Sequence, residues 1–372
     1  MSQEVSIKQD RVASIDVLRG FAMFLILGTQ IGGAPIFKTF VNLLGPDVVA
    51  ATAHQFSWTV PGVNLMNVAQ SIFIFVVGLV LPFSLGKRLA QTGKRKTYLH
   101  IVRRSLILFV LGTIAGGHLL DFKLETFYFY NNVLEYISVG YLVCSLLVLN
   151  TSQRTQWFVT VGILLLVWAI WGLIPAPGWE GDRFSTEMNI GIYLDRLLLG
   201  PHGHPFKGWT ASLNTISQIG NMMLGVLMGH IIFSPREKTV KCKMLFACGC
   251  GMLLIGWLWS FVFPSLRRYM TSSYVLEACG LATVLLAFFY WIVDIRGYTK
   301  WAFFFIVFGA NSIAIYMMAH LFDFRLIGNI FVGGICSHLP PAVGDFIQAV
   351  TAMAVMWLIM YYMYRKKTFL KI

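Results

Sequence analysis

Apolar residues along this chain come in long blocks, and shorter polar or charged stretches separate the blocks. A helix that crosses the hydrocarbon core of a bilayer needs roughly 20 predominantly apolar residues. The pattern therefore predicts ten transmembrane helices, at about 18–34, 62–85, 101–119, 132–150, 156–175, 213–233, 244–263, 273–294, 302–322 and 344–364. We predict an all-α, polytopic membrane protein with one transmembrane domain over residues 1–372.

The composition agrees with this prediction and excludes a soluble domain. Hydrophobic residues make up 57% of the chain and charged residues only 12%. A soluble protein carries about twice that charge. The chain is therefore expected to be an integral membrane protein.

The distribution of basic residues sets the predicted orientation. With the N-terminus inside, all but eight of the 29 lysines and arginines fall in cytoplasmic segments. The eight outside are Lys38, Lys123, Arg183, Arg196, Lys207, Arg267, Arg268 and Arg325. The positive-inside rule thus places both termini in the cytoplasm. The net charge of +13 follows from this bias and does not indicate nucleic-acid binding.

Three of the predicted outer loops are long, at about 35–61, 176–212 and 323–343. Loops usually carry recognition, so their length favours a substrate site on the extracytoplasmic side. A transporter could have the same composition, and the polar residues must distinguish the two.

Polar side chains recur inside the predicted spans. Any one of these side chains could form an ordinary interhelical hydrogen bond. Together they predict a hydrated cavity, because it would be too costly for so many polar side chains to face lipid. The residues are Gln30, Asn64, Asn67, Gln70, Glu135, Glu277, Asn311 and Ser312.

An acid and a base stand at the cytoplasmic mouth of the first span. Asp16 and Arg19 are three residues apart, so they share one helical face and can pair. Charges at the edge of the hydrocarbon layer are costly and mark a candidate functional site. The alternative is a helix cap followed by an anchoring charge.

His54 lies in a histidine-aromatic segment of the first long outer loop, Ala53 to Trp58, and this segment is expected to dip into the cavity. Its imidazole could accept a proton at neutral pH or act as a nucleophile toward an acyl group. An interfacial histidine without chemistry is the alternative.

No metal or nucleotide motif is evident. The six cysteines lack CxxC spacing, and His202 with His204 forms a pair without a third ligand. No Walker loop, Rossmann fingerprint, GxSxG elbow or HExxH is present. We therefore expect no metal, and any cytoplasmic cofactor must lie between helix ends.

A series of short motifs runs along nearly the whole chain, from about residue 11 to the end. They are Arg11 with Ser14-Ile15-Asp16 and Arg19-Gly20, Ala53-His54 to Ser57-Trp58, Phe73 to Gly78, Arg104-Ser105, Val133-Leu134 to Tyr141, Tyr193 to Gly200, Leu224-Gly225, Val293-Asp294, Asn311-Ser312 to Tyr316, and Tyr364 to Lys367. In these motifs and in their order along the sequence, the chain resembles the transmembrane heparan-α-glucosaminide N-acetyltransferase family and its bacterial relatives.

The resemblance implies transfer of an acetyl group from cytoplasmic acetyl-CoA to the amine of an extracytoplasmic glucosamine-type sugar. It makes His54 the active histidine, with Gln30 in place of the family's asparagine. It also implies a bacterial inner-membrane location and a possible homodimer, with membrane lipid and the two substrates as partners. The residues then expected on the acceptor are Asn67, Glu135, Tyr141 and Asp195.

Three departures from the family leave the acceptor open. The family commonly has an acid at Asn67, a Gln-Arg pair at Glu135-Tyr136, and an acidic segment at 205–208. An acidic group suits an ammonium-bearing sugar. Acylation of a hydroxyl, or of an amino sugar held by other groups, therefore remains an alternative.

For the donor, we expect fixed cations at the cytoplasmic mouth to hold the CoA phosphates. Gln30 or Asn311 could donate to the developing oxyanion, while His54 deprotonates the amine or carries the acetyl group. The expected donor-binding residues are Asp16, Arg19, Arg103, Arg104 and Asn311.

Two other functions remain as alternatives. A sugar transporter also fits ten spans around a polar interior, although no internal repeat or matched pair of broken spans is evident. A structural or sensory protein would have little need for a histidine over a polar cavity.

Overall fold

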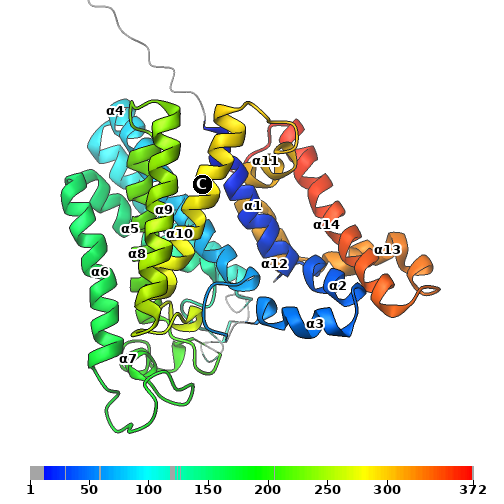
Figure 1. Cartoon of the computed structure of the whole chain (residues 1–372), viewed down its shortest axis with the longest axis horizontal. Helices are drawn as coiled ribbons and strands as arrows, with labels where there is room; N and C mark the ends of the chain where they lie inside the picture. The colour runs from blue at the N-terminus through cyan, green and yellow to red at the C-terminus, as the bar shows by residue number, and fades with distance from the viewer. Residues whose placement is uncertain are drawn as a thin grey trace, which may run out of the picture.

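The computed structural model describes residues 12–370, apart from 30, 58–59, 118–121, 124, 126 and 205. Within these residues all regular structure is helical, which confirms the predicted all-α class. The elements are α1 (Ala13–Thr29), α2 (Ile36–Leu43), α3 (Pro46–Thr52), η1 (Ala53–Phe56), α4 (Leu65–Ala115), α5 (Val133–Asn150), α6 (Gln153–Leu173), α7 (Ile190–Leu198), η4 (Gly200–His202), α8 (Ser212–Ile232), α9 (Lys238–Ser260), η5 (Arg267–Tyr269), α10 (Ser272–Phe289), the π-helix η6 (Tyr290–Ile295), α11 (Phe303–Ala310), α12 (Ser312–Leu321), α13 (Phe324–Cys336) and α14 (Pro341–Arg365) (Figure 1).

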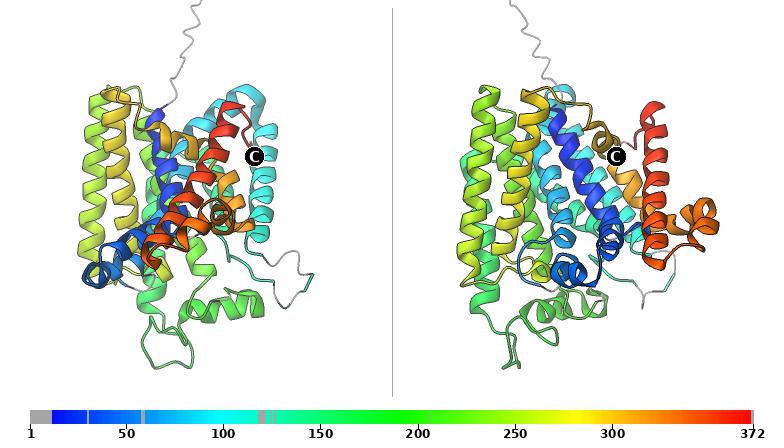
Figure 2. Two further views of the ribbon diagram at one scale, coloured as in Figure 1. Left: turned by 90° about the vertical axis from the view of Figure 1, so that its right-hand side faces the viewer. Right: turned by 45° about the vertical axis from the view of Figure 1, so that its right-hand side comes forward.

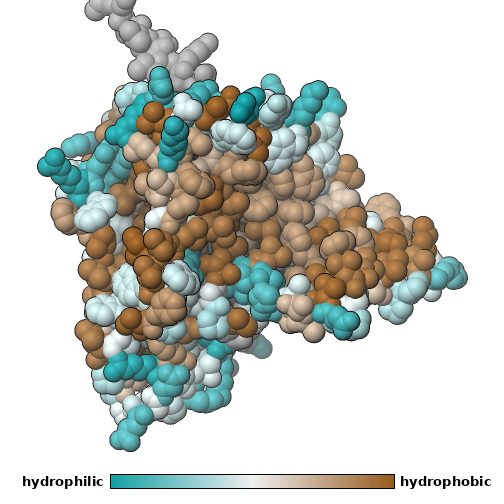
Figure 3. Space-filling model, in the orientation of Figure 1, coloured by the Kyte–Doolittle hydropathy of each residue, from teal (hydrophilic) through white to brown (hydrophobic). Residues whose placement is uncertain are grey.

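Seven of the described helices are long and apolar enough to cross a membrane, and there are eight if the bent pair α11 and α12 forms one span. Each predicted window overlaps a helix, but α1 has only 17 residues and two windows merge in the 51-residue α4. Apolar residues form a belt across the molecule, with hydrophilic residues above and below it (Figure 3). The number of crossings and the cytoplasmic termini stay predictions.

Gly93 divides α4 into two arms. Its φ of 76° and ψ of 170° are not helical, and this region of backbone space is open essentially to glycine alone. The basic segment around this break separates the two predicted windows. One continuous element therefore supplies two apolar arms.

Glycines bring the central helices into backbone contact. A Cβ added to Gly225 of α8 would lie 2.2 Å from the carbonyl oxygen of Phe75 on α4. A Cβ added to Gly20 of α1 would lie 1.8 Å from the carbonyl oxygen of Phe305 on α11. Small residues at helix crossings allow this approach in membrane proteins. The apolar window of α8 is accordingly 72% buried, against 22% for the peripheral α9.

The segments between α1 and α4 and between α6 and α8 lie at the same end of the helical bundle (Figure 2). They contain the short helices α2, α3, η1, α7 and η4. This is the end where the sequence predicts the long outer loops.

The ninth predicted span is broken at Asn311, where α11 and α12 meet at an angle of 74°. The Asn311 amide binds the C-terminal tail on both of its atoms. Its Nδ2 donates to the carbonyl oxygen of Thr368 at 2.9 Å, and its Oδ1 accepts from the Leu370 N–H at 3.1 Å. The tail is therefore held at the break.

Candidate active site

Two cavities lie inside the helical bundle. We call them the inner cavity, which contains Arg19 and Asn311, and the outer cavity, which contains Gln70 and Arg267. Their volumes are about 420 Å³ and about 650 Å³. Helices α1, α4, α5 and α12 line both cavities.

The inner cavity is basic. Arg19, Arg88, His100 and Arg104 line it, and none of the other described residues in its lining is acidic. The guanidinium carbon of Arg104 lies 4.6 Å from the ring centroid of Tyr141, in cation–π geometry. This contact holds the guanidinium over the ring. Three arginines around one pocket provide the geometry that binds phosphates.

The predicted donor residues only partly converge on this cavity. Arg19, Arg104 and Asn311 line it, whereas Asp16 and the exposed Arg103 do not. Asp16 lies behind Arg19, with 3.6 Å between its Oδ1 and the Arg19 Nη1. Tyr141, predicted on the acceptor, lies in the inner cavity instead.

A short turn places Arg267 in the outer cavity. Arg267 is only 3% exposed, and its Nη2 donates to the Gln70 Oε1. Its guanidinium carbon lies 5.6 Å from the ring centroid of Trp209. His204 stacks on the same indole, with ring centroids 5.3 Å apart. Burial and the Arg267 charge lower the pKa of His204 to about 4. This imidazole is therefore neutral at pH 7, and the lowered pKa makes it a weak proton acceptor.

A hydrogen bond ties the two helices at the outer cavity's wall together. The Tyr316 hydroxyl donates to the Oδ1 of Asn132 at 3.0 Å, and the same oxygen caps the Leu134 N–H. Asn132, Tyr316 and His320 all line this cavity. Polar donors and acceptors from α5 and α12 thus face a space large enough for a small polar ligand.

Only a thin wall separates the cavities. On α5, Val133 lines the outer cavity and the next residue, Leu134, lines the inner one. On α4, Gln70 and Phe73 line opposite cavities across three residues, a helical rise of about 4.5 Å. A group at the tip of a ligand in one cavity is therefore close to the other cavity.

The side chain of His54 is exposed and lines neither cavity. Its Nε2 lies 2.7 Å from the Nε2 of Gln55, and its carbonyl oxygen accepts from the Asn64 Nδ2. Gln55 in turn accepts from the Leu65 N–H. These hydrogen bonds hold the segment against the first turn of α4, about one and a half turns from Gln70. The catalytic role of His54 stays a prediction, and Gln30 lies outside the described residues.

Two residues predicted on the acceptor serve as helix caps. Asn67 forms a capping box with Asn64, since each side chain accepts from the other's backbone N–H at 2.9 Å. The carboxylate of Asp195 accepts from the N–H groups of Ala211 and Ser212, at 2.6 and 2.8 Å, and so joins α7 to the start of α8. These contacts position the loops around the outer cavity.

Glu135 is fully buried at the start of α5. Its Oε2 accepts from the Tyr130 N–H, while its Oε1 has no partner. Its neighbours Val133 and Tyr136 line the outer cavity, but Glu135 itself lines neither cavity. Glu277, also predicted to face a cavity, accepts from the Ser265 hydroxyl at 2.6 Å.

Sequence reasoning missed most of the residues in the outer cavity and two residues, Arg88 and His100, in the inner cavity. One signal for Arg267 was available, because it belongs to a basic pair on the side that the positive-inside rule leaves poor in charge. The polar residues on α8 had no distinct spacing. The missed residues are Arg88, His100, Asn132, Tyr136, His204, Trp209, Asn214, Gln218, Arg267, Tyr316 and His320.

Comparison with known proteins supports the resemblance. A family described as a domain of unknown function (DUF5009) matches residues 11–192. Heparan-alpha-glucosaminide N-acetyltransferases from Homo sapiens and Mus musculus are 26% and 25% identical to this chain, over 97% and 98% of its length. The chain spans about 60% of the length of these relatives. The predicted resemblance is thus confirmed, and the chain is a distant homologue of heparan-alpha-glucosaminide N-acetyltransferases.

Proposed function

We propose that this protein is a membrane acetyltransferase. It takes an acetyl group from acetyl-CoA in the inner cavity and delivers it to the amine of a glucosamine-type sugar in the outer cavity. The observation that carries this proposal is the pair of cavities, one basic and one polar, separated by about one helical turn. The named relatives are N-acetyltransferases, which supports the same reaction class. A bacterial cytoplasmic membrane is the proposed location.

The basic inner cavity suits the donor. Acetyl-CoA carries several phosphate charges at one end and a neutral thioester at the other. Arg88 and Arg104 would hold the phosphates, and Arg19 would add a third cation beside Asp16. The uncharged arm would then extend toward the wall that Leu134 and Phe73 form.

The reaction needs one group that accepts a proton and one hydrogen-bond donor that stabilises the oxyanion. The sugar amine attacks the thioester carbonyl, the carbon–nitrogen bond forms and the carbon–sulfur bond breaks. The amine loses a proton to an imidazole, and the thiolate of CoA leaves and takes up a proton. A general base contributes about 10²–10⁴-fold to such a step.

Three imidazoles are candidates for the base. His54 is the one that the family resemblance indicates, whereas His204 and His320 line the outer cavity. We assign the role to His54 in the substrate complex, which requires the 53–57 segment to turn its side chain toward Gln70. His204 would instead stack against the sugar together with Trp209.

The direct test is acetyl-CoA turnover by the purified protein. We expect thiol release with glucosamine, and none with N-acetylglucosamine or glucose, because only glucosamine offers a free amine. Release with glucose as well would mean hydroxyl acylation. Release that depends on no sugar, or no release at all, would remove the proposal.

Variants then assign the residues. We expect Arg104→Gln to raise the KM for acetyl-CoA by roughly 10–100-fold, the value of one charged hydrogen bond, with a smaller effect on kcat. Arg103→Gln is the matched control, since Arg103 is the exposed neighbour. His54→Ala is expected to lower kcat at least 100-fold. If His204→Ala or His320→Ala does so and His54→Ala does not, the base is assigned wrongly.

A further inference from the structure

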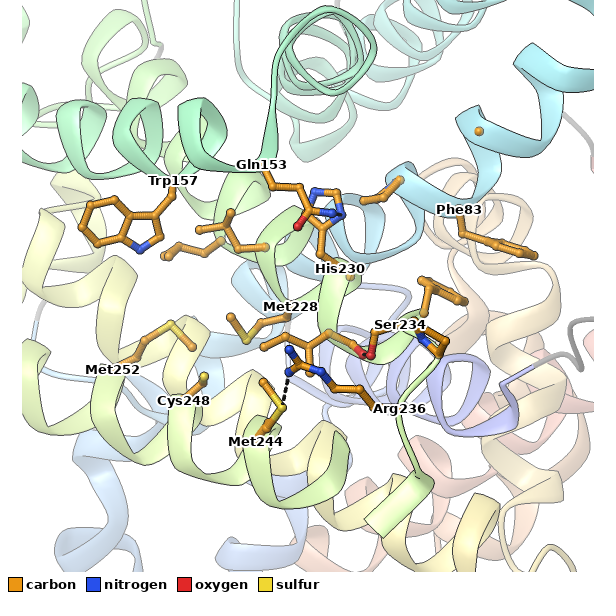
Figure 4. Close-up of a pocket in the computed structure, with 18 of the residues that line it drawn as sticks. Phe83, Gln153, Trp157, Met228, His230, Ser234, Arg236, Met244, Cys248 and Met252 are labelled. Atoms are coloured by element: carbon orange, nitrogen blue, oxygen red, sulfur yellow. Dashed lines mark hydrogen bonds between the residues drawn. The ribbon is translucent and has the colours of Figure 1, made fainter. Parts of the chain in front are cut away.

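A third cavity, apart from the two of the candidate site, opens between α4, α6, α8 and α9 (Figure 4). Its volume is about 1400 Å³, larger than either cavity of the site. The floor is the outward face of α8, where Met228 is labelled in the view, and the walls carry Trp157 of α6 and Met252 of α9. We call this cavity the lateral groove.

Helix packing explains why the groove exists. Gly249 of α9 faces α10, where an added Cβ would lie 2.8 Å from Val284 Cγ2. Gly280 of α10 faces α9 in the same way, with an added Cβ 2.7 Å from the Leu253 N atom. These small residues seat α9 on α10. The face of α8 between α6 and α9 is therefore only partly covered, with Leu227 and Ile231 half-buried.

One end of the groove is polar and basic. Lys87 and Arg236 line it there and both are exposed, and the part of the chain that the structure describes adds no acidic residue to the lining. The Arg236 Nη1 donates to the thioether sulfur of Met244 at 2.6 Å. A thioether is a weak acceptor, so this bond uses little of the guanidinium's capacity. Both residues belong to the basic segments that the positive-inside rule places in the cytoplasm.

A partly buried network of side-chain hydrogen bonds holds His230 at the polar end. His230 lies between two glutamines of α6, with Nε2 2.8 Å from the Gln156 Oε1 and Nδ1 3.2 Å from the Gln153 Nε2. This pattern fits the neutral imidazole protonated at Nε2, so His230 adds no charge. The cationic character of the groove therefore comes from Lys87 and Arg236.

We propose that the lateral groove binds an anionic phospholipid of the cytoplasmic leaflet. The phosphate lies between Lys87 and Arg236, and the acyl chains lie on α8 against Trp157 and Met252. Charge complementarity selects this occupant, because two exposed cations, with no acid among the described residues that line the groove, match an anionic headgroup above hydrocarbon chains. Glu237 follows Arg236 in the sequence but does not line the groove. The site is separate from the proposed acetyl transfer.

The test uses the full chain purified in an uncharged detergent. Phosphatidylglycerol or phosphatidylcholine of equal chain length is added as mixed micelles, and native mass spectrometry counts bound lipids. The thermal midpoint is followed with lipid concentration, since a ligand that binds the folded state raises it. We expect saturable binding of phosphatidylglycerol and a weaker, non-saturating effect of phosphatidylcholine.

Matched variants locate the site. Lys87→Gln and Arg236→Gln are each expected to weaken phosphatidylglycerol binding roughly five-fold, while Lys243→Gln, an exposed residue of α9 outside the groove, leaves it unchanged. Gly251→Phe is expected to fill the groove, because a Cβ there meets nothing within 4 Å. Gly162→Phe, equally open but outside the groove, is its control.

Several results would overturn the proposal. Equal binding of the two lipids would mean ordinary contact with the bilayer. Competition by glycerol phosphate at the same concentration as the lipid would mean that the site binds phosphate and that the acyl chains contribute nothing to binding. A change from dimer to monomer in Gly251→Phe, without loss of lipid, would mean that a second copy of the chain covers the groove.

Discussion

The contact between Gly20 and α11 offers a sharp test of how packing positions the inner cavity. An alanine at Gly20 would place its Cβ 1.8 Å from the Phe305 carbonyl oxygen, about 1.6 Å short of ordinary contact at 3.4 Å. Both partners are backbone or Cβ atoms, so no side chain can rotate away. Helix α1 must therefore move away from α11 by more than 1 Å.

That movement would separate two groups that line the same cavity. Arg19 precedes Gly20 on α1, and Asn311 directly follows α11. Overpacking of this kind costs about 1–3 kcal/mol of stability, and a 1 Å misplacement near a reacting group costs about 100-fold in rate. We expect Gly20→Ala to lower both the thermal midpoint and acetyl transfer, with a raised KM for acetyl-CoA.

Gly86→Ala is the matched control, because an added Cβ there meets nothing within 4 Å. Alanine also favours a helix over glycine by about 1 kcal/mol, so this variant should keep or raise the thermal midpoint. Thermal unfolding followed by tryptophan fluorescence measures stability, and thiol release measures turnover. If Gly20→Ala behaves like Gly86→Ala in both assays, the backbone contact between α1 and α11 does not position the cavity.

Two further predictions concern the outer cavity and the tail. Because the pKa of His204 falls from 6.5 to about 4 on folding, the unfolded chain takes up a proton that the folded chain does not, and stability should fall by up to about 3 kcal/mol as the pH drops from 6.5 to 4. His204→Gln should flatten this part of a plot of thermal midpoint against pH; an unchanged slope would contradict it. Asn311→Leu should release the segment 368–370, losing two hydrogen bonds of about 1 kcal/mol each, and hydrogen exchange of the Leu370 amide should accelerate. Unchanged exchange would contradict the tail contact.

The helices could be predicted well because apolar blocks long enough to cross a bilayer are visible directly in the amino-acid sequence. The sequence predicted separate spans at 62–85 and 101–119, and the structure joins them in α4, with the break at Gly93. A single glycine in a basic stretch is equally consistent with a loop between two helices and with a bend within one helix. Helix boundaries of this kind depend on packing around the turn.

The site was predicted unevenly, for a physical reason. Arg19 and Arg104 meet in one cavity because they lie near the predicted cytoplasmic ends of their spans, and position along a span is readable from sequence. Asn311 reaches the same cavity from the middle of the ninth predicted span, where the chain breaks between α11 and α12. Asn67 and Gln70 both carry a side-chain amide and are three residues apart, yet Asn67 caps α4 while Gln70 faces the outer cavity. The spacing Asn64-x-x-Asn67 before an apolar run fits a capping box as well as a polar face. Which role applies depends on Tyr274 and Arg267, which approach from distant parts of the chain.

The arrangement of charge also separates acetyl transfer from sugar transport. Both functions suit two cavities on opposite sides of shared helices, but a transporter must pass its whole substrate through the wall, whereas a transferase passes only an acetyl group. Three arginines and, within the described ranges, no acid line the inner cavity, so it repels a glucosammonium ion and attracts a polyphosphate. We therefore expect proteoliposomes with acetyl-CoA inside to acetylate external glucosamine without accumulating free sugar. Accumulation of unmodified glucosamine in the absence of acetyl-CoA would show instead that the wall opens for the sugar, and that the protein is a permease.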